Sequence, residues 1–128
     1  MASELRVTTI ANNAGTESVN TTYVVNGSAK SWLNLNGTGT IAQRDSLNHS
    51  STTDGGTGTY TFSLTSSMGD TNYISPTNCD RTIDTRNATE GVQYLDIVAG
   101  SYKIECVNTS PTLADQELVN TQTLGDLA

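Results

Sequence analysis

The sequence predicts an all-β protein, an antiparallel β-sandwich or barrel of about ten short strands with a short strand at its N-terminus. Short alternating or β-branched runs recur along the chain, and glycine, asparagine or aspartate, which favour turns, follow most of them. No stretch repeats apolar residues with the period of about 3.6 that a long helix needs, and no fixed repeat indicates a solenoid.

Length and composition predict one small domain that lacks apolar residues. The chain has 128 residues, of which 34% are hydrophobic and 15% charged, and threonine, serine, asparagine and glycine make up most of the rest. So few charges argue against intrinsic disorder. A thin core is often completed by other subunits, so we expect a homo-oligomer.

The net charge of −7 argues against a nucleic-acid partner, because neutralising phosphates requires a basic surface. The first residues contain no apolar core of a signal peptide, and no stretch approaches the roughly 20 apolar residues of a membrane span. We therefore expect synthesis in the cytoplasm and no membrane insertion.

The N-terminal part is expected to begin with two strands. Residues 5–10 alternate in character and end at the turn-forming residues 12–15. Residues 21–25 are β-branched or aromatic and end at Asn26 and Gly27, a dipeptide that favours a tight turn. We assign residues 1–23 to an N-terminal attachment segment and residues 24–128 to the β-sandwich domain.

The middle of the chain contains the clearest strands. Residues 30–36 place Leu33 and Leu35 on one face, with Trp32 and Asn34 on the other. Weaker candidates at residues 38–45 and 47–53 precede a glycine loop at residues 54–58. In residues 59–64 we expect the apolar side chains to point inward and the hydroxyl side chains outward; the inward set is Tyr60, Phe62 and Leu64, and the outward set is Thr59, Thr61 and Ser63.

The last part of the chain is expected to close the sheets. Candidate strands are residues 73–79, in which Pro76 indicates an edge or bulge, and residues 82–85, 93–98 and 101–106. Residues 114–124 are read as a closing strand rather than a short helix, because β-branched residues dominate their second half. In residues 101–106 the inward side chains are Tyr102, Ile104 and Cys106.

The two cysteines, Cys79 and Cys106, fit a disulfide in an oxidising compartment or two buried thiols in a protein made in the cytoplasm. No metal site is expected, since His49 is the only histidine and neither cysteine has zinc-ligand spacing. Asn78, Asp80 and Asp84 offer oxygen ligands for calcium, but their spacing is not that of an EF-hand.

No catalytic residue or cofactor is expected. No Gly-x-Ser-x-Gly elbow is present, and the glycine loop at residues 53–58 lacks the lysine and helix of a phosphate-binding loop. Paired carboxylates would be needed for glycoside hydrolysis. The candidates nearly all lie in turn-like contexts, where aspartate caps the backbone; they are Asp45, Asp54, Asp70, Asp80, Asp84, Glu90 and Asp96.

Trp32 is the main candidate contact residue. An exposed aromatic ring on a polar β-surface is typical of carbohydrate or protein contacts. The alternative, which the thin core favours, is that both faces of this strand are buried, one inside the sandwich and one against a neighbouring subunit. Leu5, Val7 and Ile10 are the candidate contact residues of the N-terminal segment.

Several motifs together resemble a domain of tail-fibre-like proteins from tailed bacteriophages, especially marine and cyanobacterial ones. They are Ala-Lys-Ser-Trp-Leu-Asn-Leu-Asn-Gly-Thr-Gly-Thr-Ile-Ala at residues 29–42, Arg-Asp-Ser-Leu-Asn at 44–48, Asp-Gly-Gly-Thr-Gly-Thr-Tyr at 54–60, Met-Gly-Asp-Thr-Asn-Tyr at 68–73, and Ser-Tyr-Lys-Ile at 101–104. The similarity continues through residues 107–110 and 115–119. The resemblance covers about residues 24–125 and implies a virion-surface protein, a trimer, with no catalytic residues to carry over.

Two functions follow as expectations. The first is a tail-fibre-like structural protein that joins the virion through its N-terminal segment and contacts a host surface glycan or protein. The alternative is a capsid or tail decoration protein that stabilises the particle without binding a receptor. The second arises because such domains often follow a fibre shaft, and no shaft precedes this one in the sequence.

Overall fold

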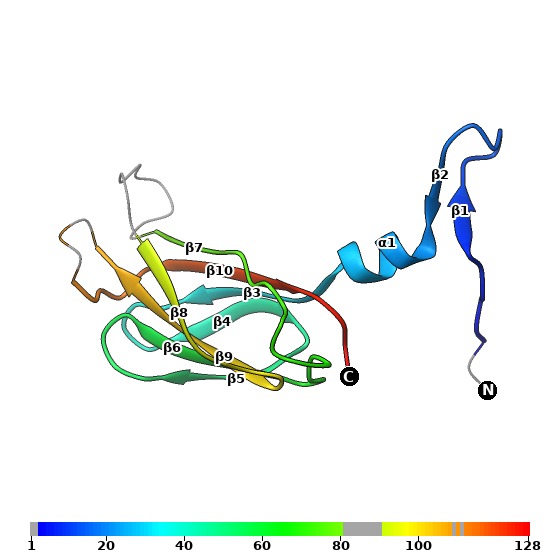
Figure 1. Cartoon of the computed structure of the whole chain (residues 1–128). Coiled ribbons are helices and arrows are strands. Elements are labelled where there is room, and N and C mark those ends of the chain that lie inside the picture. The colour runs from blue at the N-terminus through cyan, green and yellow to red at the C-terminus, as the bar shows by residue number, and fades with distance from the viewer. Residues whose placement is uncertain (1–2, 81–90, 109, 111) are drawn as a thin grey trace.

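The computed structural model describes residues 3–80, 91–108, 110 and 112–128. In this part of the chain, antiparallel strands form one sheet of two strands and two sheets of four (Figure 1). This confirms the predicted all-β fold. The two four-stranded sheets lie face to face as a β-sandwich, not as a closed barrel.

The first sheet has the order β4-β3-β10-β7, with strands β3 (Ala29–Asn36), β4 (Ala42–Leu47), β7 (Thr77–Asp80) and β10 (Leu118–Leu124). The second sheet has the order β5-β6-β9-β8, with strands β5 (His49–Asp54), β6 (Thr59–Leu64), β8 (Gly91–Val98) and β9 (Ser101–Val107). Hairpins supply three of the outer pairs, β3–β4, β5–β6 and β8–β9, whereas the fourth, β7–β10, joins segments far apart in the sequence. The central pairs, β3–β10 and β6–β9, join segments far apart in the sequence.

Most expected strands of the sandwich are present. β3, β6, β8 and β9 agree closely with their predicted ranges, and residues 114–124 end in a strand, β10, rather than a helix. Two strands are shorter than expected, because β4 begins only at Ala42 and β7 only at Thr77. The expected strand at residues 82–85 lies outside the described residues.

The core lies between the two sheets and uses the predicted alternation. Its fully or nearly fully buried members include Leu33, Leu35, Tyr60, Phe62, Leu64, Tyr102, Ile104, Cys106 and Val119. Cys79 is also buried there, so both cysteines belong to the core. One orientation was wrong: Thr59 is buried, because it starts β6 directly after the loop and packs against Gly55.

Buried hydroxyl groups complete this core. The Thr121 hydroxyl lies 3.0 Å from the hydroxyls of both Tyr102 and Ser75. Ser31 and Thr123, both fully buried, are joined by a hydroxyl contact of 2.6 Å. Because paired hydroxyls can be buried at little net cost, a chain with few apolar residues can still fill a close-packed interior.

Residues 3–28 form a separate arm. It consists of a two-stranded hairpin, β1 (Thr9–Ala11) and β2 (Ser18–Asn20), followed by the helix α1 (Thr21–Gly27). The arm extends from one end of the sandwich, the end at which the C-terminus also lies (Figure 1). None of its strand or helix residues is buried.

The arm departs from the predicted secondary structure. Residues 21–25 form a helix and not a strand, and Asn26 and Gly27 end that helix instead of forming a hairpin turn. The Asn20 side chain accepts a hydrogen bond from Thr22 N at 2.8 Å, which caps the first turn. With no neighbouring strand to pair with, this local cap prevails over the strand preference of the β-branched residues.

Candidate functional site

A groove of about 520 Å³ crosses the outer face of the first sheet, over β3, β10 and β7. We call it the amide groove. The side chains that face it are those that alternate with buried residues of the same strands: Trp32, Asn34, Asn78, Asn120 and Gln122. A groove of this volume, lined by one indole and several amides, suits a small ligand.

Strand register aligns three of these amides in one row. Asn120 on β10 pairs with Asn34 on β3 and with Asn78 on β7. Side chains at paired positions point to the same side of a sheet, about 5 Å apart. The adjacent row contains Trp32 opposite Gln122, so the indole borders the amides directly.

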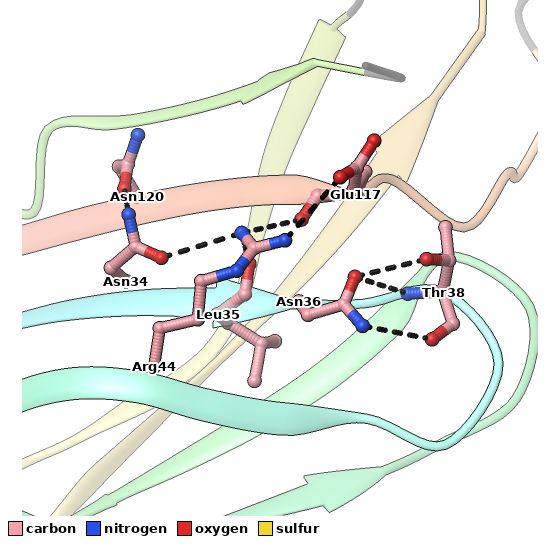
Figure 2. A network of polar contacts seen from close by, with 7 residues as sticks. All are labelled: Asn34, Leu35, Asn36, Thr38, Arg44, Glu117 and Asn120. Carbon is pink, nitrogen blue, oxygen red and sulfur yellow. Dashed lines mark hydrogen bonds and ion pairs between the residues drawn. The ribbon is translucent and has the colours of Figure 1, made fainter. Parts of the chain in front are cut away.

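Arg44 on β4 fixes one end of this row (Figure 2). Its guanidinium reaches over β3, donates to the Glu117 carbonyl at 2.8 Å, and lies 3.6 Å from the Glu117 carboxylate. It also donates to Asn34 Oδ1 at 3.4 Å. Asn34 Nδ2 in turn donates to Asn120 Oδ1 at 2.8 Å.

This chain of donors sets the orientation of two amides. An arginine can only donate, so the Asn34 oxygen faces Arg44 and its nitrogen faces Asn120. Asn120 then presents its Nδ2 group to the groove. In the described part of the chain, no hydrogen bond engages this nitrogen or the side-chain amides of Asn78 and Gln122.

The predicted contact residues fall on two separate surfaces. Trp32 is 37% exposed at the amide groove, while Leu5, Val7 and Ile10 are exposed on the arm. The groove's asparagines were not predicted, although Asn34 was placed on the same face as Trp32. Only the pairing of β3, β10 and β7, which no local pattern shows, brings Asn34, Asn78 and Asn120 together.

Only two of the described acidic candidates, Asp54 and Asp70, cap turns; the expected turn context is wrong for the other three, since Asp45, Asp80 and Asp96 lie within β4, β7 and β8. Asp54 accepts a hydrogen bond from Gly56 N at 2.9 Å, and Asp70 accepts one from Asn72 N at 2.7 Å, which lowers the pKa of the Asp70 carboxyl. Asp84 and Glu90 lie outside the described residues. The glycine loop is a hairpin between β5 and β6, in which Gly56 and Gly58 have positive φ.

His49, at the start of β5, is partly buried, and its ring nitrogens are enclosed. Its ring makes edge contacts with Phe62 and Tyr102, and neither ring nitrogen has a hydrogen-bond partner among the described residues. Burial lowers the pKa of His49 to about 4. The imidazole is therefore uncharged at neutral pH.

Within the described ranges, no group of three or more histidine, cysteine or acidic residues is arranged to hold a metal ion. Of the suggested calcium ligands, Asp84 lies outside those ranges. No helix in the described part of the chain is long and apolar enough to span a bilayer. Comparison with protein-family models, curated proteins and solved structures gave no match.

Proposed function

We propose that this protein is a tail-fibre-like structural protein of a tailed-phage virion, made in the host cytoplasm and assembled as a homotrimer. Its arm attaches to other virion proteins, and its sandwich presents the amide groove to a receptor on the host surface. The sequence resemblance supports the virion assignment. The division of the chain into a self-contained sandwich and a coreless arm supports the two roles.

The arm carries the proposal. It exposes apolar side chains that contribute nothing to a core: Leu5, Val7, Ile10, Val19, Tyr23, Val24 and Val25. Ile10 and Val19 face the same side, as a directly opposed cross-strand pair. An isolated two-stranded hairpin is marginally stable in water, so such an arm gains stability when a partner covers it.

Two measurements, one on purified phage particles and one on phage adsorption to host cells, test this function. Mass spectrometry and antibody labelling should find the protein on the virion, and the purified protein should compete with phage for adsorption to host cells. Absence from particles would overturn the virion assignment. Presence without competition would overturn the receptor role.

The arm equally supports a decoration protein that ties capsid or tail subunits together. Copy number separates the two functions. A fibre is present as a small number of trimers per particle. A decoration protein is present in a copy number that matches that of the capsid or tail subunits.

A further inference from the structure

We propose that the amide groove binds an uncharged glycan, with a sugar ring stacked on Trp32 and its hydroxyls bonded to Asn78, Asn120 and Gln122. The inference rests on the proposed function, because it names the chemistry of the receptor that the sandwich would contact. Four features of the groove lead to it.

The first feature is the indole. Trp32 is the only tryptophan of the chain and keeps 37% of its surface exposed at the groove, although its strand neighbours Ser31 and Leu33 are buried. A pyranose ring has an apolar face of C–H groups. Such a face packs on an aromatic ring, and the hydroxyls around its edge stay free for hydrogen bonds.

The second feature is the set of available amides. Asn78 and Gln122 can each donate and accept, and Asn120 Nδ2 can donate, since its oxygen already accepts from Asn34. A sugar hydroxyl also donates and accepts, so amides satisfy it in both roles. An apolar protein surface packed here would instead bury these amides without partners, at about 1–3 kcal/mol each.

The third feature is spacing. Successive same-face residues of a strand lie roughly 7 Å apart, and neighbouring strands are about 5 Å apart. The Trp32–Gln122 row and the Asn34–Asn120–Asn78 row are therefore adjacent. A ring stacked on Trp32 places its hydroxyls within reach of both rows.

The fourth feature is the absence of charge. No lysine, arginine, aspartate or glutamate lines the groove among the described residues. The nearest guanidinium, that of Arg44, is engaged by Glu117 and holds Asn34. Anionic sugars would find no cation to pair with, so a neutral glycan is the favoured ligand. Arg44 is a positioning residue, which acts through the amide orientation of Asn34 and Asn120.

The test uses the full chain and two sets of polysaccharides. Neutral probes are dextran, mannan, galactan and β-glucan; acidic probes are alginate and polysialic acid. Binding is measured by affinity electrophoresis and by the fluorescence of Trp32, which reports on the groove alone because the chain has no other tryptophan. We expect at least one neutral probe to bind and to change this fluorescence, and the acidic probes not to bind.

Variants locate the site. Trp32→Ala and Asn78→Ala should each weaken binding about tenfold or more, a change of roughly 1.4 kcal/mol. Arg44→Met should also weaken binding, although Arg44 does not contact the ligand. Ile97→Ala, an exposed apolar change on β8 of the other sheet, should bind as the unmodified chain does. Circular dichroism melts confirm that each variant is folded.

Two results overturn the inference. One is unchanged binding by Trp32→Ala. The other is no binding to any neutral probe; if Trp32→Ala also converts an oligomer to monomer, the groove is assigned to a subunit interface. Periodate-oxidised host cells separate this inference from the proposed function. If the protein still blocks phage adsorption to such cells, the receptor role stands and the proposal that the receptor is a glycan fails.

Discussion

Gly37 shows how a single residue can link the two sheets of the sandwich. It follows β3, its N–H donates to the Gln116 carbonyl at 2.9 Å, and its carbonyl accepts from the Tyr60 hydroxyl at 2.9 Å. A Cβ at this position would lie 2.4 Å from the Tyr60 hydroxyl and 2.7 Å from the Gln116 carbonyl. Glycine is required here by close approach.

We therefore expect Gly37→Ala to lower the free energy of unfolding by about 2–3 kcal/mol, because the buried Tyr60 ring or the backbone must move. Urea denaturation measures the change. Gly27→Ala is the control, since a Cβ there meets nothing within 4 Å and stability should change little. Equal stability of the Gly37 variant and the unmodified chain would contradict the packing described.

His49 makes stability depend on pH. Its folded pKa of about 4 lies below its ordinary value of 6.5, so the unfolded chain binds the extra proton first. This contribution is full above pH 6.5 and is lost as pH falls from 6.5 towards 4. For this partly enclosed ring the loss is on the order of 2 kcal/mol.

His49→Leu should remove that part of the pH dependence. Comparing the two proteins by urea denaturation at several pH values cancels the titration of the carboxylates, which they share. A constant difference in stability between pH 7 and pH 4 would show that His49 is not the titrating group.

At the scale of the element, β10 is the strand on which the first sheet depends. It lies between β3 and β7, and its alternate residues serve opposite surfaces. Val119, Thr121 and Thr123 face the core, whereas Asn120 and Gln122 line the amide groove. One strand therefore couples the stability of the sandwich to the shape of the amide groove.

Thr121→Val tests the buried side of β10. The change preserves shape but leaves the Tyr102 and Ser75 hydroxyls without the Thr121 oxygen, so we expect a loss of about 1–3 kcal/mol in thermal or urea unfolding. Thr61→Val on β6 is the matched control, expected within about 0.5 kcal/mol. A Thr121 variant as stable as this control would mean that the hydroxyl network adds no stability.

At the scale of the whole molecule, the arm and the sandwich differ in how they are stabilised. The sandwich buries its own core, whereas the arm buries none of its strand or helix residues. Removing residues 1–28 should therefore leave the melting temperature of the sandwich within a few degrees of that of the full chain. The same deletion should abolish incorporation into particles.

Differential scanning calorimetry and particle assembly measure these two outcomes. Ile10→Asp is the companion variant, which keeps the chain full-length and places a charge on the apolar side of the hairpin. If the truncated sandwich unfolds, the arm is part of the folding unit. If Ile10→Asp still joins particles, this side of the hairpin is not the contact surface.

The sequence by itself determined the sandwich strands and their inner faces. Alternation is a local property, so Tyr60 and Phe62, or Tyr102 and Ile104, could be assigned to a buried face from their spacing alone. The same pattern placed Leu33 inward and Trp32 outward. Strand preference gave the wrong prediction at residues 21–25, because the side-chain cap of Asn20 stabilises a helix there.

Only the tertiary structure decided which side chains lie beside Trp32. Asn34, Asn78 and Asn120 are far apart in the sequence and form a row because β10 pairs with both β3 and β7 in one register. Register depends on pairing between distant strands, and a shift by one residue would turn these amides to the other face. The sequence therefore determined which side chains leave the core, and the pairing of distant strands decided that they form a groove.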